Sequence, residues 1–187
     1  MAKTPSNMTM ALGSKAPDFS LPDTISGQTL HLYKEVQARG TLIMFICNHC
    51  PYVKHVQEGI VKLAKDYMPK GIHFFAISSN DVANYPEDSP QKMKEEALKM
   101  SYPFPYLYDE TQNVAKAYSA ACTPDFYVFD NMLKCVYRGQ LDDSRPGNGI
   151  EVSGKDIRLA LDNLLSGEEP LKIQKPSIGC NIKWKQA

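Results

Sequence analysis

A buried strand that passes directly into a helix is the strongest constraint in this sequence. Residues 41–47, Thr-Leu-Ile-Met-Phe-Ile-Cys, form a continuous apolar, partly β-branched run, which is typical of a central strand covered on both faces. Pro51 suits the first turn of a helix. Apolar residues then recur at helical spacing up to the stop signal Pro-Lys-Gly at 69–71: Val53, Val56, Ile60, Leu63 and Tyr67. The sequence therefore predicts a strand, a turn and a helix.

The rest of the chain alternates in a similar way. We predict a hairpin over 19–21 and 28–32, a second buried strand over 72–78, helices over 89–100 and 110–118, and a short extended piece over 104–108. A second hairpin, over 125–129 and 133–138, precedes a last helix that begins at the capping sequence 153–156 and ends at Gly167. This order indicates an α/β domain with a mixed sheet between helices.

The chain reads as one domain with two terminal extensions. Its 187 residues, 43% of them hydrophobic, contain no internal repeat and no linker long enough to separate two cores. We expect a flexible N-terminus over 1–10, a single domain over 11–167 and a C-terminal tail over 168–187. The tail holds Cys180 and the only tryptophan, Trp184, so we expect it to dock on the domain.

Charge and hydropathy exclude several classes of function. Lys+Arg and Asp+Glu both total 21, so no net field and no basic block favours nucleic acid. No apolar run approaches the roughly 20 residues that span a bilayer, and the polar residues 1–10 lack the apolar core of a signal peptide. We expect a cytoplasmic protein whose partners are small molecules or proteins, and neither nucleic acid nor a membrane.

Cys50 is the candidate nucleophile. It lies where the strand gives way to the helix, so its sulfur faces unsatisfied N–H groups and the positive end of the helix dipole. That placement favours the thiolate, which is the reactive form of cysteine, and a protonated His49 would add positive charge. The alternative is that Cys50 is a small buried hydrophobic residue. If the chain from Cys47 to Cys50 stays extended, the two Cα atoms lie about 10 Å apart, so a disulfide between them requires a local turn.

The same segment also contains possible metal ligands. A Cys-x-x-Cys pair can supply half of a zinc site, and four soft or borderline ligands lie close together in the sequence: Cys47, His49, Cys50 and His55. No second Cys/His pair appears at ligand spacing. The sequence therefore predicts no metal site and no bound cofactor.

Several motifs, in this order, resemble a known family. Ala-Pro-Asp-Phe-Ser-Leu at 16–21, the strand into Cys50 and Thr123-Pro124 before a strand are similar to the thioredoxin-fold redoxins. More specifically, the chain resembles a peroxiredoxin-like, AhpC/TSA-type group with Cys-Asn-His-Cys-Pro at 47–51 and Pro-Ser-Ile-Gly-Cys-Asn-Ile-Lys-Trp at 176–184. The resemblance covers nearly the whole chain. It implies a three-layer thioredoxin-like fold, with helices on both faces of a mixed sheet and an N-terminal hairpin extension.

The resemblance also implies roles for individual residues. Thr123-Pro124 becomes the cis-proline loop that faces the nucleophile, which brings Cys122 near Cys50. A second thiol must attack oxidised Cys50, and three residues are candidates alongside it in the catalytic set: Cys47, Cys122 and Cys180. Cys122 and Cys180 have an alternative as packing residues. The expected substrate-binding residues are His49, Pro51, Thr123 and Pro124.

Two functions fit these features. The first is a thiol-disulfide oxidoreductase or peroxiredoxin-like antioxidant enzyme, in which Cys50 acts on a protein disulfide or a peroxide and an external thiol, either a thioredoxin-like protein or a small thiol, restores it. The second is a redox-sensing or protein-binding module without turnover. In the thioredoxin motif, the second cysteine falls at the position of Val53 and the buried aspartate at the position of Met44. Both departures favour the module without turnover. Cys47 replaces the threonine that positions the peroxide in peroxiredoxins.

Overall fold

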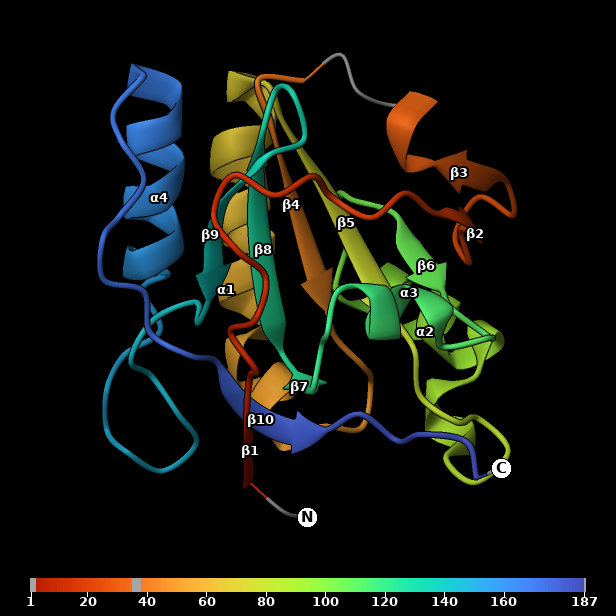
Figure 1. The fold of residues 1–187 in the computed structure, drawn as a ribbon. Helices are drawn as coiled ribbons and strands as arrows, with labels where there is room; N and C mark the ends of the chain where they lie inside the picture. Colours follow the sequence, from red (N-terminus) through yellow and green to blue (C-terminus); the bar gives the residue numbers. More distant parts are fainter. Residues whose placement is uncertain (1–2, 35–37, 187) are drawn as a thin grey trace.

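The computed structural model describes residues 3–34 and 38–186, and a five-stranded mixed sheet lies at its centre (Figure 1). The sheet has the order β6-β5-β4-β8-β9. Its strands are β4 (Gly40–Phe45), β5 (Ile72–Ser78), β6 (Tyr106–Tyr108), β8 (Asp125–Asp130) and β9 (Cys135–Gly139). The first three are parallel, β8 is antiparallel to β4, and β9 is antiparallel to β8. The strand predicted from the apolar run is therefore the middle strand of the sheet.

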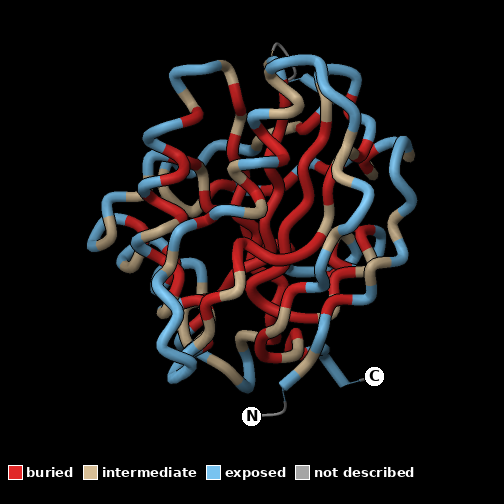
Figure 2. Tube along the Cα trace, turned by 90° about the vertical axis from the view of Figure 1, so that its left-hand side faces the viewer, coloured by how far each residue is buried: buried red, intermediate tan, exposed pale blue. Residues whose placement is uncertain are grey.

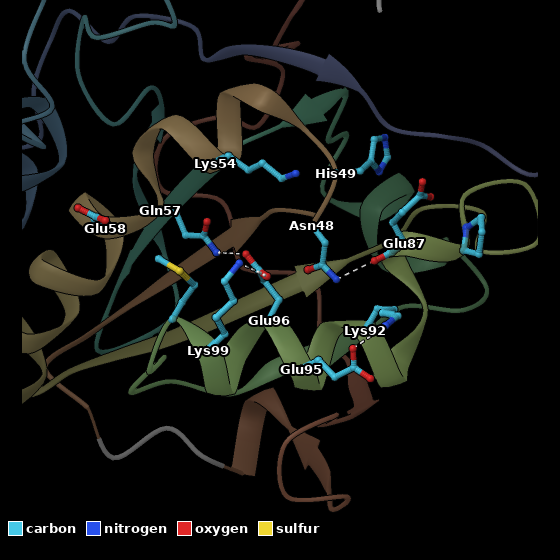
Figure 3. A pocket seen from close by; sticks show the side chains of 12 residues that line it. Asn48, His49, Lys54, Gln57, Glu58, Glu87, Lys92, Glu95, Glu96 and Lys99 are labelled. Carbon is cyan, nitrogen blue, oxygen red and sulfur yellow. Dashed lines mark hydrogen bonds and ion pairs between the residues drawn. The ribbon is translucent and has the colours of Figure 1, made fainter.

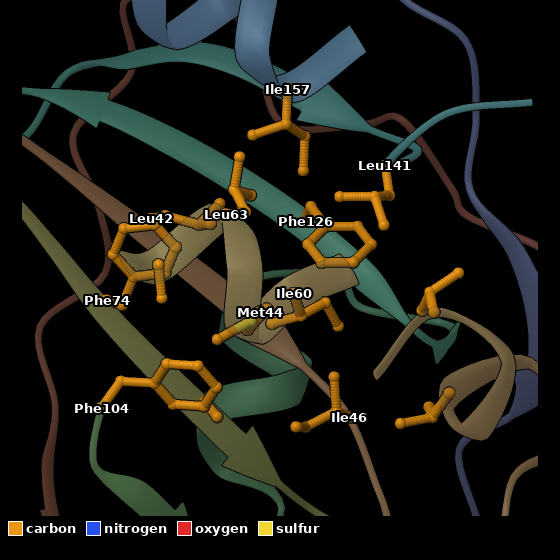
Figure 4. Packing of buried hydrophobic residues seen from close by; sticks show 14 of the residues in the cluster. Leu42, Met44, Ile46, Ile60, Leu63, Phe74, Phe104, Phe126, Leu141 and Ile157 are labelled. Carbon is orange, nitrogen blue, oxygen red and sulfur yellow. The ribbon is translucent and has the colours of Figure 1, made fainter. Parts of the chain in front are cut away.

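Helices cover both faces of this sheet, which confirms the predicted three-layer architecture. The helices are α1 (Pro51–Tyr67), α2 (Pro90–Lys99), α3 (Asn113–Ala117) and α4 (Lys155–Ser166), with short 3-10 turns η1 (Leu32–Lys34), η2 (Met68–Lys70) and η3 (Pro86–Asp88). α1, α2 and α4 pack on one face, and α3 packs on the other with the segment around Phe19. Figure 4 shows Ile60 and Leu63 of α1 and Ile157 of α4 against sheet residues such as Met44.

The central strand supplies side chains to both layers of the core. Leu42 and Met44 point to the face covered by α1, whereas Ile43 and Phe45 point to the opposite face, and all four are at most 1% exposed. This explains the nearly continuous apolar run, because a strand that is covered on both faces favours apolar side chains at successive positions. Figure 2 shows buried segments, in red, gathered in the middle of the molecule, with exposed segments, in pale blue, around them.

The two ends of the chain meet in a separate small sheet. β10 (Ile178–Asn181) lies between β1 (Lys3–Pro5) and β7 (Cys122–Thr123) and is antiparallel to both (Figure 1). The sequence predicts a flexible N-terminus over residues 1–10, but Lys3–Pro5 forms β1 and covers the outer edge of β10; residues 1–2 lie outside the described residues. Pairing with β10 satisfies backbone groups that would otherwise be left at an open edge.

Most predicted boundaries agree with the structure. β2 (Ser20–Pro22) and β3 (Thr29–His31) form the expected N-terminal hairpin. The helix predicted over 110–118 is reduced to α3, because Asp109 Oδ2 bonds Ser79 Oγ at 2.8 Å and the Ala115 N–H at 3.0 Å instead of capping a longer helix. None of the helices in the described residues has the length and apolar character needed to cross a membrane.

Candidate active site

The segment that carries the predicted nucleophile is a loop between the sheet and a helix. β4 ends at Phe45 and α1 begins at Pro51, so the chain from Cys47 to Cys50 does not continue the strand. The loop between β4 and α1 supplies the local turn that a Cys47–Cys50 contact requires. Cys50 is the N-cap residue of α1 and Pro51 occupies its first turn, as predicted.

Cys50 is enclosed by other parts of the chain. Its side chain is 0% exposed. Its Sγ atom lies 2.7 Å from Cys180 Sγ on β10 and 3.2 Å from the Thr123 carbonyl oxygen on β7. Because a disulfide bond is about 2.05 Å long, Cys50 and Cys180 are positioned to form one without a large backbone movement. The structure thus brings together two cysteines that are separated by 130 positions.

The surroundings of Cys50 favour its thiolate. A hydrogen bond from the Cys47 thiol is the largest influence that lowers the pKa of Cys50, which falls to about 5. Burial opposes this shift, while hydrogen bonds from Cys180, the Val53 N–H and Thr123 reinforce it. The Val53 contribution is the helix-start effect that the sequence predicts. At neutral pH Cys50 therefore carries the negative charge that nucleophilic attack requires.

The other thiols have the opposite tendency. The hydrogen bond to Cys50, together with burial, raises the pKa of Cys47 well above its usual value. Burial raises the pKa of Cys180 to about 12 and that of Cys135 to about 11, and it also raises the pKa of Cys122. All five cysteines are free. Cys50 is thus the one cysteine whose pKa is lowered.

Thr123 and Pro124 form the expected loop opposite Cys50. The Thr123–Pro124 peptide bond is cis, which confirms the prediction from the resemblance. Thr123 contacts both sulfur atoms of the loop, since its Oγ1 atom lies 3.4 Å from Cys47 Sγ and its carbonyl oxygen lies 3.2 Å from Cys50 Sγ. Cys122 Sγ instead points to the Pro124 carbonyl oxygen at 3.8 Å. Among the described residues no hydrogen bond joins Cys122 to Cys50.

Asp88 holds the cysteine loop in place, a role that was not predicted from the sequence. Its side chain is fully buried, and Oδ1 accepts hydrogen bonds from the N–H groups of Asn48 at 2.8 Å and His49 at 3.3 Å. Oδ2 lies 2.5 Å from His49 Nδ1 and accepts from Asn80 Nδ2 at 2.8 Å. Burial opposes ionisation, but these bonds keep the pKa of Asp88 below its usual value. A buried carboxylate therefore fixes the backbone beside Cys50.

His49 connects this loop to a cleft on the surface. Its ring stacks on Tyr85 with centroids 5.3 Å apart, and its Nε2 atom is buried with no hydrogen-bond partner in the described part of the chain. The cleft has a volume of about 1060 Å³ and is lined by Asn48, His49 and side chains of α1 and α2. Figure 3 shows lysine and glutamate side chains around it. His49 thus lies between the buried thiols and an open surface.

The tail is fastened beyond β10 by polar contacts. The Lys183 N–H donates to Asn80 Oδ1 and its carbonyl accepts from the Asp81 N–H, both at 2.8 Å. Gln112 bonds the Lys183 carbonyl and the Lys185 N–H, each at 2.9 Å. Trp184, by contrast, is 39% exposed. Main-chain bonding rather than the tryptophan side chain therefore holds the end of the tail.

Comparison with known proteins finds similar structures and a matching family. Two solved structures align over nearly the entire chain. An uncharacterized conserved protein from Geobacillus kaustophilus is 62% identical, with a TM-score of 0.97 over 100% of this chain and 98% of that one. A hypothetical protein from Sinorhizobium meliloti 1021 is 45% identical, with a TM-score of 0.95 over 98% and 100%.

More distant structures share the fold. Peroxidoxin BcpB from Mycobacterium tuberculosis is 18% identical, with a TM-score of 0.64 over 84% of this chain and 97% of that one. No curated protein matches the sequence. Residues 12–138 match the AhpC/TSA family. Because this match covers more than half of the chain and the two most similar structures above share the whole fold, the chain belongs to the AhpC/TSA family.

Proposed function

We propose that the protein is a thiol-dependent oxidoreductase in which Cys50 is the nucleophile and Cys180 resolves its oxidised form. The observation that carries this proposal is the 2.7 Å separation of the two sulfur atoms. A pKa of about 5 for Cys50 supports the choice of nucleophile. The higher pKa of Cys180 suits a thiol that becomes a nucleophile only after Cys50 has reacted.

The same pair serves either substrate class. With a hydroperoxide, the Cys50 thiolate attacks one oxygen, the O–O bond breaks, and sulfenic acid and an alcohol or water result. The Cys180 thiol then displaces the sulfenic oxygen as water and forms the Cys50–Cys180 disulfide. With a disulfide substrate, Cys50 displaces one thiolate, and Cys180 attacks the mixed disulfide and releases the other. Two equivalents of an external thiol reduce the Cys50–Cys180 disulfide and become oxidised to a disulfide.

The cysteines support a proposal for the compartment. Five free thiols, all buried, are typical of a protein kept reduced by the thiol pools of the cytoplasm. We therefore propose the cytoplasm as the compartment and a thioredoxin-like protein or a small thiol as the reductant. His49 and Pro51 flank Cys50 in the chain, and Thr123, which precedes Pro124, contacts its sulfur atom; we propose that these four residues contact the substrate.

Reaction at Cys50 requires the tail strand to move. An oxygen atom or a substrate sulfur on Cys50 needs the space that Cys180 occupies at 2.7 Å. Cys50 and Cys180 are 0% and 2% exposed. A small hydroperoxide needs only a local shift of β10, whereas a protein disulfide needs the strand to leave the surface.

The test is to oxidise the reduced protein with one equivalent of hydrogen peroxide or a small-molecule disulfide and to map the products by mass spectrometry. We expect a Cys50–Cys180 disulfide in the wild type and no reaction in Cys50→Ser. In Cys180→Ser we expect sulfenic acid to accumulate on Cys50. Formation of the disulfide on Cys47 or Cys122 at the wild-type rate in Cys180→Ser would refute the assignment of the resolving thiol.

A sensing function without turnover is the second candidate, and the complete burial of Cys50 favours it. In that case one oxidation would lock β10 to the loop and alter the surface near the tail. Steady-state assays with a thioredoxin system separate the two functions. Many turnovers per protein molecule support the enzyme, whereas one equivalent consumed per protein molecule supports the sensor.

A further inference from the structure

We propose that Cys47, His49 and Asp88 form a binding site for a zinc(II) ion beside the redox pair. The Cys47 sulfur, a ring nitrogen of His49 and a carboxylate oxygen of Asp88 all lie within 4.8 Å of one another. In a tetrahedral zinc site, bonds of about 2.0–2.3 Å place the ligand atoms roughly 3.3–3.8 Å apart. Side-chain shifts of about 1 Å therefore bring the three atoms onto one ion.

The chemistry of the three ligands selects the metal. A thiolate and an imidazole are poor ligands for magnesium and calcium, which prefer sets of oxygen atoms. One sulfur, one nitrogen and one oxygen form a mixed set of the kind that zinc accepts. Cys47 releases its proton to solvent when the ion binds, and the resulting thiolate and the Asp88 carboxylate balance the two positive charges of the ion. A water molecule completes four-coordination.

The surroundings of the ligands resemble the outer shell of a metal site. Asp88 accepts hydrogen bonds from the Asn48 N–H and from Asn80 Nδ2, both at 2.8 Å, which orient its carboxylate. Stacking on Tyr85 fixes the His49 ring. Within the described residues, His49 Nε2 has no hydrogen-bond partner although it is buried, so the imidazole has bonding capacity that the protein does not use.

The cleft provides access for the ion and for its water ligand. His49 and Asn48 line a cleft of about 1060 Å³ that is open to solvent. Cys47 and Asp88 lie behind them and are at most 2% exposed. Sequence spacing alone predicts no metal site, because the third ligand is an aspartate 39 residues beyond His49 rather than a second Cys/His pair. The two sites share Cys47, which also donates a hydrogen bond to Cys50. Neither Cys50 nor Cys180 is a ligand, however, so zinc binding and disulfide formation are separate measurements, and failure of one proposal is distinguishable from failure of the other.

Titration of the reduced, full-length protein with zinc chloride by isothermal calorimetry tests the site, with cobalt(II) as a spectroscopic probe. We expect one zinc ion per chain and a thiolate-to-cobalt charge-transfer band. His49→Gln and Cys47→Ser should each weaken zinc binding by at least about 10- to 100-fold, since even outer-shell changes have effects of that size. Cys47→Ser should also abolish the cobalt band.

Two variants serve as matched controls. His55 bonds Ser144 Oγ at 2.7 Å and lies outside the cluster, so His55→Gln should bind zinc like the wild type. Cys180→Ser removes the thiol beside Cys50 and should also bind zinc like the wild type. Asp88 anchors the loop backbone, so a substitution of Asp88 would disturb folding as well as zinc binding. His49→Gln tests the site without this complication, because the His49 side chain does not anchor the backbone. Failure to bind micromolar zinc, unchanged binding in His49→Gln and Cys47→Ser, or loss in Cys180→Ser alone would overturn the proposal.

Discussion

Two segments meet at Cys50, and they are held in different ways. The loop around Asn48 and His49 is continuous with β4 and α1, and the buried carboxylate of Asp88 binds its backbone. β10 has four residues and, within the part of the chain that the structure describes, pairs only with the short strands β1 and β7. The loop is therefore held by the main sheet, α1 and Asp88, whereas β10, which buries Cys180 in the same core, is held by short strands. This difference suits a chemistry in which the nucleophile stays fixed and its partner thiol moves.

The largest effect should come from the anchor of the loop. Asp88→Ala leaves the buried N–H groups of Asn48 and His49 without their acceptor and breaks the contact with the His49 ring. Each buried N–H group left without an acceptor costs about 1–3 kcal/mol, so for the two groups we expect urea unfolding to show a loss of about 2–6 kcal/mol. Glu87→Ala, at the exposed neighbouring position, should change the free energy of unfolding by less than about 0.5 kcal/mol. Equal stability of the two variants would show that the loop is not anchored by Asp88.

A substitution in the tail strand should expose Cys50 at a smaller cost in stability. A Cβ atom at Gly179 would overlap the Thr123 carbonyl oxygen, so Gly179→Ala pushes β10 away from β7. We expect a loss of about 1–3 kcal/mol in local docking and a rise of about tenfold or more in the rate at which iodoacetamide alkylates Cys50.

Cys135 provides an internal control for that experiment, because it is buried in the cluster on the other face of the sheet. Its labelling rate should not change in Gly179→Ala. Faster labelling of both cysteines would indicate global destabilisation, and the distinction between a fixed loop and a detachable strand would be lost.

The charge on Cys50 should depend on its neighbour in the loop. Cys47→Ala removes the strongest hydrogen bond to the thiolate. A hydrogen bond to a charged group contributes about 1.5–3 kcal/mol, so the pKa of Cys50 should rise by about one unit or more. Ultraviolet thiolate absorbance, with Cys50→Ser as the blank, should give a midpoint near pH 5 in the wild type.

The sign of the accompanying change in stability follows from the same shift. The pKa of Cys50 is lower in the folded protein than the value of about 8.5 for a free thiol. The thiolate therefore stabilises the fold fully above about pH 8.5, and this contribution disappears as the pH falls through about 5. In Cys47→Ala the contribution should be smaller at pH 7. An unchanged absorbance midpoint in this variant would contradict the role assigned to Cys47.

The sequence predicted the parts of the site that depend on local order. The apolar run, Pro51 and the helical spacing of Val53 and Val56 place Cys50 at the start of α1, because strand and helix periodicities are properties of neighbouring residues. The cis bond at Thr123–Pro124 followed from the family resemblance. The tail contact of Cys180 was one of three alternatives, since spacing along the chain could not choose between them.

The parts that were missed depend on contacts between distant residues. Asp88 lies in a polar turn, and nothing in its neighbourhood shows that its carboxylate reaches the backbone of Asn48. The sequence predicted a flexible segment where β1 lies, because three residues with one proline have little strand character of their own. They form a strand by pairing with β10. The size of Trp184 suggested that its side chain anchors the tail. Hydrogen bonds from the main chain of the tail to Asn80, Asp81 and Gln112 hold the tail instead.

The smallest effect should come from that tryptophan. Trp184 is partly exposed, and its ring lies 5.9 Å from Lys116 Nζ; a cation–π contact at such a site contributes about 0.5–1 kcal/mol. Trp184→Ala should therefore raise the alkylation rate of Cys50 by no more than about fivefold. Gln112→Ala, which removes two bonds to the tail worth about 0.5–1.5 kcal/mol each, should raise it by more. If Trp184→Ala has the larger effect, the side chain and not the backbone fastens the tail, and the detachable unit must extend through the last residues of the chain rather than end at β10.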